Sequence, residues 1–298
     1  MTRASAEQSS KTGGAPGEQE PQGLYVVASP IGNARDITLR ALDVLKSCDL
    51  IAAEDTRVTA KLLAIHGISK PLTAYNDHNA ARERPKLLRR LREGARIALI
   101  SDAGTPLISD PGYKLVREAL QEGIAVHAIP GASAVLTALT LAALPTDRFL
   151  FAGFLPSKGG ERRSTLEDLR AIPATLVFFE SPHRIAESFA AMHKVLGDRP
   201  AAVARELTKL HEEVCRGNLQ SLADEFARRE QVKGEITIVV GPPAVAAPDF
   251  RKADALLNEA MAHMPLSAAA ELVARALDLP KRALYERALA LKNRDEDG

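Results

Sequence analysis

The chain has 298 residues, of which 46% are hydrophobic and 26% are charged, and its formal net charge is +1. This composition is ordinary for a globular protein, and the length is enough for two domains with separate cores. A net charge this small excludes a global basic field, so any nucleic-acid partner must meet a local patch.

Cysteine usage and the apolar runs indicate the compartment. Cys48 and Cys215 have neither metal-ligand spacing nor that of a disulfide framework, which predicts a reduced, cytoplasmic protein without a bound metal. The longest apolar run, residues 134–144, is far shorter than the roughly 20 residues of a membrane span, so no membrane partner is expected. Residues 1–22 are rich in Ser, Gly, Glu, Gln and Pro and lack a signal-peptide core, which predicts a disordered tail.

Residues 23–144 alternate strand-like apolar runs with amphipathic helical segments, such as one near 38–46. This alternation predicts an N-terminal α/β domain with a mainly parallel sheet. Ligand sites in such sheets lie at the carboxyl ends of the strands. The predicted strands are residues 24–28, 50–53, 96–100 and 124–129.

The stretch "LISDAGTPLISDPG", residues 99–112, carries more constraints than a simple turn needs. Asp102 comes directly after a strand, where its carboxylate can accept hydrogen bonds from ligand hydroxyls or an amine. Ala103 and Gly104 permit close backbone contact, and Thr105 adds a hydroxyl. A ligand-binding loop is the sharper interpretation, and elaborate turn chemistry is the alternative.

The end of the same stretch predicts the start of a helix. Asp110 can cap this helix, Pro111 suits its first position and Gly123 suits its end. We therefore interpret Asp110 and Pro111 as structural residues, in contrast to the ligand-facing first half of the stretch.

Two further strand ends open on small residues. In "ASPIGN", residues 28–33, Gly32 lets a ligand approach the backbone, although a tight turn alone also explains the pattern. It is neither G-x-G-x-x-G nor a lysine-bearing phosphate loop, so no classical nucleotide site is predicted. In "IPGASAV", residues 129–135, Ser133 can cap the next helix, whose free N–H groups would face the same crevice as residues 99–112; a plain helix cap is the alternative.

The segment "AAEDTR", residues 52–57, crowds charges at the end of an apolar strand. Glu54 or Asp55 could take a proton from a polar substrate, and Arg57 could hold a phosphate. The alternative is a helix cap with a solvated ion pair.

A second α/β domain is predicted over residues 145–243. Only "TKLH" separates its third and fourth strands, which is too short for a crossover helix. That pair should be an antiparallel hairpin, which makes the second sheet mixed. The predicted strands are residues 148–154, 175–180, 201–207, 212–217 and 235–241.

Acids, bases and cations gather at the strand ends of this second domain, around "ESPHR". A lone histidine such as His183 is more often a surface or capping residue than a catalyst. No group matches a known class of metal site. The charged residues are Glu180, His183, Arg184, Arg205, Glu206, Lys209 and Glu235.

The C-terminal segment, residues 250–298, follows a Pro- and Ala-rich linker and contains no strand signal. Ser267 can cap one of its helices and Pro280 can open another. Helical patterns cover residues 252–262, 267–277 and 281–292.

Taken in order, these segments resemble the tetrapyrrole methylase superfamily of methyltransferases that use S-adenosyl-L-methionine (AdoMet). The resemblance is strongest to its ribosomal branch, the 16S rRNA (cytidine-2'-O)-methyltransferases. It covers residues 23–243. The motifs that carry it are "LYVVASPIGNARDITLRAL", "AEDTR", "SDAGTPLISDPG", "PGASA", "FFESPHR" and "KGEITIVVGPP".

The resemblance implies two α/β domains with AdoMet folded in the cleft between them. Corrin and haem-precursor members carry G-x-G-x-G where this chain has "ASPIGN", which favours the ribosomal branch over a porphyrinoid substrate. The implied cofactor-binding residues are Pro30, Ile31, Gly32, Asp102, Ala103, Gly104, Thr105, Ser133, Ala134, Phe179 and Ala204.

The implied reaction is attack of a cytidine ribose 2'-oxygen on the methyl group of AdoMet, in the decoding region of the small ribosomal subunit. A nearby base would remove the hydroxyl proton. Asp55, Glu54, Glu180 and Lys209 are the candidates, and the sequence does not choose among them. The alternatives are another RNA site, a small-molecule acceptor, or an RNA-binding assembly factor with a vestigial AdoMet pocket.

The resemblance also implies a homodimer and a small helix-turn-helix-like C-terminal domain. We interpret "PSKGGERR", residues 156–163, as a mobile basic loop on the side of the cleft. A cationic stripe in the last helix, formed by Lys281, Arg282, Arg287 and Lys292, could track RNA phosphates or belong to a solvated amphipathic helix. The residues predicted to bind 16S rRNA are Arg57, Lys158, Arg162, Arg163 and Arg184.

Overall fold

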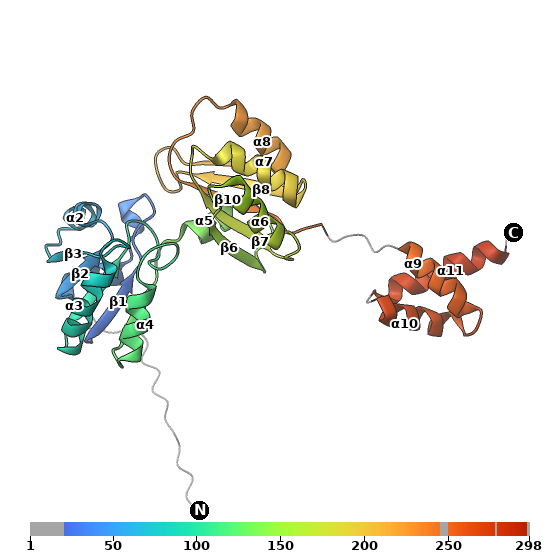
Figure 1. The fold of residues 1–298 in the computed structure, drawn as a ribbon, viewed down its shortest axis with the longest axis horizontal. Helices are drawn as coiled ribbons and strands as arrows, with labels where there is room; N and C mark the ends of the chain where they lie inside the picture. The colour runs from blue at the N-terminus through green and yellow to red at the C-terminus, as the bar shows by residue number, and fades with distance from the viewer. Residues whose placement is uncertain (1–20, 245–249, 278, 297–298) are drawn as a thin grey trace, which may run out of the picture. The chain divides into compact units, whose positions relative to one another are not determined.

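A computed structural model describes residues 21–244, 250–277 and 279–296 (Figure 1). The chain divides into two compact units, one up to Pro243 and one from Ala244 onward. The predicted tail, residues 1–22, lies outside the described residues except for its last two, and so does most of the predicted linker.

The first sheet contains five strands, and all of its pairings are parallel, as predicted. Two strands have the bounds expected from their apolar runs. The three half-buried residues of β3 form no such run, which is why they were missed. In the order β3-β2-β4-β1-β5, the strands are Leu72–Ala74, Leu50–Ala53, Arg96–Ile100, Gly23–Val27 and Val126–Ile129.

Helices cover both faces of this sheet because alternate residues of each strand point to opposite sides. Tyr25 and Val27 pack with α1 and α2, whereas Leu24 packs with α3 and α4. The helical elements are η1 (Ala34–Asp36), α1 (Leu39–Ser47), α2 (Thr56–Ile65), α3 (Ala80–Arg92), α4 (Tyr113–Gln121) and α5 (Ala134–Ala142).

The predicted start of α4 was wrong. Gly112, not Asp110, is its N-cap, with φ at 134°, and Pro111 precedes the helix. A Cβ at position 112 would lie 2.8 Å from the Leu99 Cδ2 atom, so close packing puts the turn at the glycine. Asp110 is thereby free of the helix. Gly123 follows the end of α4 with φ at 74°, as predicted.

The second sheet is mixed, and β8 and β9 form the predicted antiparallel hairpin. Only β6 and β7 pair in parallel. In the order β6-β7-β10-β8-β9, the strands are Phe149–Phe154, Thr175–Glu180, Ile236–Val240, Pro200–Arg205 and Glu213–Asn218.

The two faces of the second sheet have different partners. Helices α6 (Gly159–Leu169), α7 (Ile185–Leu196) and α8 (Leu219–Arg228) pack on one face around Phe178 and Phe189. Helix α5, which follows the last strand of the first sheet, packs on the other face. This helix joins both sheets into one unit and positions the space between them.

The predicted basic loop at 156–163 was also wrong, because α6 begins at Gly159. Gly159 and Gly160, which favour a loop in the sequence, lie in the first turn of this helix. The Arg162 side chain is 9% exposed and its Nη2 atom lies 3.1 Å from Glu187 Oε2 on α7. Tertiary packing against α7 therefore overrides the loop-like composition.

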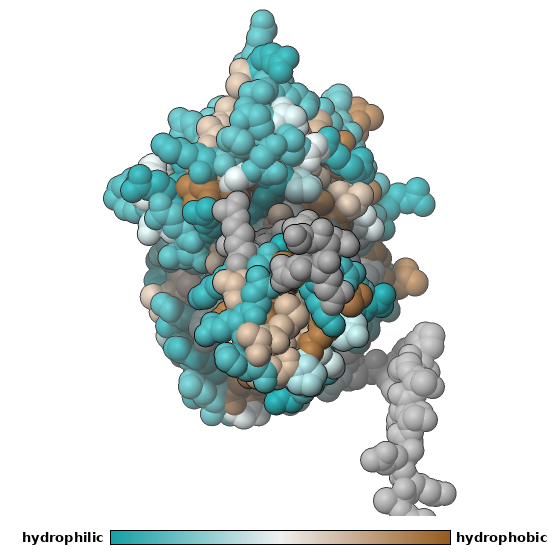
Figure 2. Space-filling model, turned by 90° about the vertical axis from the view of Figure 1, so that its right-hand side faces the viewer, coloured by the Kyte–Doolittle hydropathy of each residue, from teal (hydrophilic) through white to brown (hydrophobic). Residues whose placement is uncertain are grey.

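The second unit consists of α9 (Phe250–Met261), α10 (Leu266–Leu277) and α11 (Lys281–Glu296), packed around Leu257 and Val273. Ser267 does not cap α10, since the helix already begins at Leu266 after a proline. Polar side chains cover most of the face seen in Figure 2. No helix within the described ranges has the length and apolar character of a membrane span.

Candidate active site

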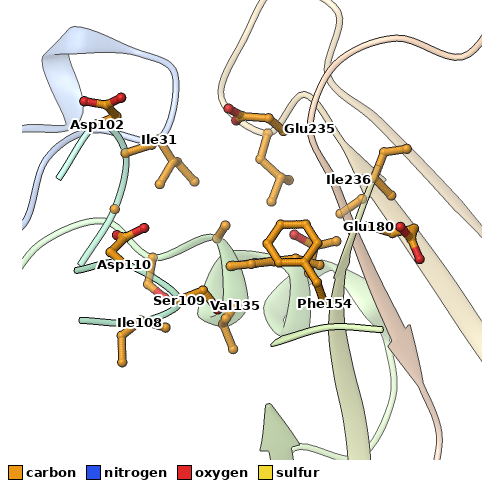
Figure 3. Close-up of a pocket in the computed structure, with 18 of the residues that line it drawn as sticks. Ile31, Asp102, Ile108, Ser109, Asp110, Val135, Phe154, Glu180, Glu235 and Ile236 are labelled. Atoms are coloured by element: carbon orange, nitrogen blue, oxygen red, sulfur yellow. The ribbon is translucent and has the colours of Figure 1, made fainter. Parts of the chain in front are cut away.

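A cavity of about 410 Å³ lies between the two sheets. Figure 3 shows Ile31, Asp102 and Asp110 on one side and Glu235 and Ile236 on the other. The first side is formed by segments that follow β1, β2, β4 and β5, which are the carboxyl ends expected to hold a ligand. The other residues that line the cavity, from both sides, include Gly104, Thr105, Ile108, Ser109, Val135, Phe154, Ser181, Leu207, Gly234 and Thr237.

The structure brings most of the predicted cofactor-binding residues to this cavity. Pro30 and Gly32 line a smaller cavity beside it, of about 230 Å³. The predicted residues in the main cavity are Ile31, Asp102, Ala103, Gly104, Thr105, Ser133, Ala134, Phe179 and Ala204.

Backbone hydrogen bonds hold the loop after β4 against the loop after β1. Ser29 and Gly104 donate to each other's carbonyl oxygens at 2.8 and 3.1 Å. Gly104 has φ at 79°, a left-handed conformation that glycine adopts without strain. The Thr105 hydroxyl donates to the Ala132 carbonyl at 3.3 Å, which ties this loop to the segment before α5. Three strand ends thus form one rigid wall.

The end of β2 is interlocked with the end of β4. The Asp55 amide donates to Asp102 Oδ1 at 3.0 Å, and the Asp102 amide donates to Glu54 Oε2 at 3.3 Å. Each acidic residue therefore positions its neighbour, and both Glu54 and Asp102 face the cavity.

The next part of the loop is strained. Leu107 and Ser109 have φ at 74° and 66°, a region that residues with a Cβ rarely occupy. Such residues cost on the order of 1–3 kcal/mol each and persist where the surrounding structure demands them. Here the strained backbone places Ile108, Ser109 and Asp110 against the cavity. These three were not among the predicted site residues. Their only signal in the sequence was that "LISD" occurs twice, at 99–102 and at 107–110.

The cavity wall is acidic. Among the described residues that line it, five are carboxylic acids and none is Lys, Arg or His. Glu180 pairs with Arg184 and Glu235 pairs with Lys209, whereas the remaining three form no ion pair among the described residues. Those three are Glu54, Asp102 and Asp110.

Burial raises the pKa of each of these three carboxyls above its ordinary value. The pKa of Asp110 rises to about 6, first through burial and further through the charges of Glu54 and Asp102. Uncompensated carboxylates in a partly apolar cavity favour a cationic ligand, which restores the lost electrostatic balance.

Two of the predicted bases are engaged elsewhere. Asp55 caps α2 through the Arg57 amide and pairs with the Arg57 guanidinium at 2.6 Å. These hydrogen bonds lower the pKa of Asp55 to about 2. Burial of Lys209 disfavours its charged form, but hydrogen bonds to Glu206 and Glu235, at 2.8 and 3.0 Å, raise its pKa overall. The first residue is a poor proton acceptor, and the second stays protonated.

The other two predicted bases differ in their free lone pairs. Glu180 is buried and accepts hydrogen bonds from the Ser181 amide at 2.7 Å and from the Ser188 hydroxyl. Its ion pair with Arg184 occupies it further. Glu54 accepts from the Asp102 amide, and burial raises its pKa. Glu54 is thus the predicted base best placed to accept a proton in the cavity.

Most of the cations predicted to bind RNA are paired within the protein. Arg184 donates to the carbonyl oxygens of Leu155 and Pro156, which joins the start of α7 to the end of β6. Arg57 has an 86% exposed side chain and remains at the surface beside its partner Asp55. The other pairs are Lys158–Glu161, Arg162–Glu187, Arg163–Glu167, Lys281–Glu271, Arg282–Glu286 and Arg287–Asp254.

A cluster of Glu213, Cys215 and Glu225 on β9 and α8 has ligand atoms within 4.8 Å of one another. Arg229 lies among them, with its Nη2 atom 2.8 Å from Glu213 and 2.5 Å from Glu225. The guanidinium compensates the charges that would attract a metal ion.

The family model of the Tetrapyrrole (Corrin/Porphyrin) Methylases matches residues 23–223, and that of the RsmI C-terminal HTH domain matches residues 247–292. The ribosomal RNA small subunit methyltransferase I of Mesorhizobium japonicum is 53% identical over 92% of this chain and 94% of its own. That of Erythrobacter litoralis is 52% identical over 91% and 95%. The chain belongs to the tetrapyrrole methylase family, in its ribosomal branch.

A solved methyltransferase structure has a similar fold. Uroporphyrin-III C-methyltransferase from Thermus thermophilus, complexed with S-adenyl homocysteine, is 20% identical and has a TM-score of 0.52. The match covers 73% of this chain and 96% of that chain. The family models and this likeness confirm the predicted tetrapyrrole methylase fold, and the second family model confirms the C-terminal helical domain.

Proposed function

We propose that this tetrapyrrole methylase transfers a methyl group from AdoMet to the 2'-oxygen of a cytidine ribose in the decoding region of 16S rRNA. AdoMet is the cofactor of the family. The observation that carries the proposal is the acidic cavity at the strand ends of a chain about half identical to small-subunit rRNA methyltransferases. Such a substrate agrees with a cytoplasmic protein, and we retain a homodimer as part of the proposal.

The cavity residues fit AdoMet. The volume of the cavity, about 410 Å³, is that of a small-molecule site. AdoMet carries a sulfonium and an ammonium group, and the walls at Glu54, Asp102 and Asp110 offer negative charge without a competing cation. Phe179 and Val135 provide apolar surface, and the backbone near Gly104 can be approached closely.

When bound, AdoMet supplies an electrophilic methyl group at its sulfonium. The protein has two tasks. The rigid wall formed by the ends of β1, β4 and β5 orients the reactants, which can account for a large part of the rate enhancement. Glu54 accepts the proton of the ribose hydroxyl, because a neutral hydroxyl is a weak nucleophile. Asp102 holds the Glu54 carboxylate in place through its amide.

The test is transfer of labelled methyl from AdoMet to small ribosomal subunits that lack this modification, followed by mapping of the modified nucleotide. We expect one ribose-methylated cytidine in the 16S rRNA. AdoMet binding without transfer to any RNA would overturn the proposal and favour an assembly factor with a vestigial pocket. Transfer to another nucleotide or to the base would retain the methyltransferase and refute the acceptor.

A further inference from the structure

The smaller cavity, of about 230 Å³, adjoins the main one and shares four lining residues with it. Those four are Ile31, Asp102, Ala103 and Glu235. The smaller cavity otherwise lies between α2, the loop after β1 and Lys209. A ligand in one cavity therefore reaches the wall of the other.

Thr59, on the α2 side of the smaller cavity, has a hydroxyl with no partner in the described structure. The residue is 2% exposed, and a buried hydroxyl without a hydrogen bond is costly. Helical threonines usually donate to the carbonyl one turn earlier, as Thr137, Thr140 and Thr165 do here, at 2.8 to 3.0 Å. The Thr59 hydroxyl therefore keeps an unused hydrogen-bonding capacity beside the smaller cavity.

The remaining walls suit a nucleoside. Pro30, Leu62 and Ile65 present apolar surface to a ring, and Lys209 with Glu235 presents a polar edge. Gly32 allows the loop after β1 to lie close to Lys209, because a Cβ at this position would be only 2.5 Å from Lys209 Cγ. Enzymes that do chemistry on a base commonly take the nucleotide out of the stack into such a pocket, and the same displacement would expose a ribose 2'-hydroxyl.

We propose that the smaller cavity receives the acceptor nucleoside, with the ribose at the wall shared with the main cavity and Thr59 hydrogen-bonded to the nucleoside. This inference rests on the proposed function. It places the acceptor beside the AdoMet cavity, and it moves Pro30 and Gly32, which the resemblance assigned to AdoMet, to the acceptor site. Glu54 lines the main cavity and Asp102 lines both, so the ribose hydroxyl would meet the proposed base across the shared wall.

The first test is Thr59→Val, which removes the hydroxyl and preserves the shape of the side chain. We expect the KM for small subunits to rise about three- to tenfold, as for one lost hydrogen bond, with unchanged AdoMet affinity. The melting temperature should stay the same or rise, because an unsatisfied buried hydroxyl has been removed. Thr140→Val, on the exposed side of α5, is the matched control and should leave the KM unchanged. A Thr59→Val enzyme with the wild-type KM would overturn the inference.

The second test fills the cavity. Val58 lines only the smaller cavity and is 41% exposed, so Val58→Trp can be accommodated without disturbing the core. We expect loss of methyl transfer with AdoMet binding retained. Leu120→Trp, at a 58% exposed position that lines neither cavity, is the control. Loss of AdoMet affinity in Val58→Trp would show that the smaller cavity belongs to the cofactor site and overturn the inference.

A binding measurement separates this inference from the proposed function. Saturation-transfer NMR with cytidine 5'-monophosphate, on enzyme loaded with S-adenosylhomocysteine, requires no turnover. A signal in the wild type that Val58→Trp abolishes supports the acceptor pocket even if no rRNA is methylated. Methylated rRNA with an equal signal in both proteins supports the function and refutes the pocket. If the wild type gives no methylated rRNA and no NMR signal, both the proposed function and the acceptor pocket are refuted.

Discussion

Asp55 and Asp110 show how environment alone divides the roles of identical side chains. The Arg57 guanidinium and amide hold the pKa of Asp55 at about 2, whereas burial near other acids raises the pKa of Asp110 to about 6. Asp55 caps a helix, and Asp110 is an uncompensated carboxyl at the cavity. Groups whose pKa values are driven apart in this way commonly mark functional sites.

Asp110→Asn should stabilise the ligand-free protein at pH 8. The folded state holds the Asp110 proton more tightly than the unfolded state does, so this residue's contribution to stability is lost as the pH rises from about 4 to about 6. We expect about 1–2 kcal/mol of extra stability at pH 8, after allowance for partial exposure, and no gain at pH 4. Urea unfolding at both pH values measures this difference. An equal change at both would contradict the assignment.

The same substitution should weaken AdoMet binding. In the wild type, Asp110 becomes charged as the pH passes about 6, and the affinity for the cationic cofactor should rise in that range. Asp110→Asn should reduce both the affinity at pH 8 and its dependence on pH, as measured by titration calorimetry. S-Adenosylhomocysteine, which lacks the sulfonium charge, is the control ligand and should respond less.

Glu54→Gln should lower kcat about 10²- to 10³-fold if Glu54 is the base. Asp55→Asn is the matched control, because asparagine also caps helices and kcat should change less than about threefold. Single-turnover methylation of small subunits at saturating AdoMet measures both. Since Glu54 must be ionised to accept a proton, the wild-type rate should rise with pH through its raised pKa. A full rate in Glu54→Gln would move the search to Asp110.

At the scale of elements, the loop after β4 contributes more of the cavity wall than any other loop among the described residues. Its first half pairs with the loop after β1, and its second half passes through two left-handed residues before Gly112 starts α4. Helix α5 contributes its capped N-terminus at Ser133 to the same cavity and packs on the second sheet.

Gly104→Ala tests whether this loop geometry matters for the cofactor. Both Gly104 and Gly123 have positive φ, at 79° and 74°, so alanine at either should cost about 1 kcal/mol. A Cβ at 104 would also lie 3.4 Å from Ile31 Cγ2 in the cavity wall, whereas a Cβ at 123 meets nothing within 4 Å. We expect thermal unfolding to detect both changes and AdoMet titration to detect only Gly104→Ala. Equal AdoMet affinities would contradict a role for the loop in binding.

At the scale of the whole molecule, the two units have separate cores. Every residue that lines the main or the smaller cavity precedes Pro243. At least three cations of the stripe in the last helix, which could track RNA phosphates or belong to a solvated helix, are in ion pairs, and Arg287 joins α11 to Asp254 of α9. Arg287 thereby has a structural role, whereas the side chains of Lys281 and Arg282 are 53% and 92% exposed, and such weak exposed pairs leave them available to phosphates.

A chain ending at Pro243 should therefore keep its fold and bind AdoMet within about twofold of the full chain, since buried cores form separately in such units. Calorimetric titration measures this affinity. Retained AdoMet binding with a raised KM for small subunits would assign substrate docking to the C-terminal unit. Loss of AdoMet binding would contradict the separation of the two units.

The sequence by itself determined most strands and the place of the site. Buried strands such as 50–53, 96–100 and 175–180 are short apolar runs between turn residues, and their bounds could be predicted for that reason. Because parallel strands end at one edge, the polar segments that follow them had to converge. The resemblance then identified the family from the same segments.

Only the tertiary structure decided which polar groups stay free. The start of α4 depends on contact with Leu99, and the helix over 159–163 depends on packing against α7. Such contacts place Asp110 in the cavity wall, and they make Asp55 a poor base by pairing it with Arg57. Hydrogen bonds and burial between residues far apart in the chain set the pKa of a carboxyl and the availability of its lone pairs, and local sequence does not contain them.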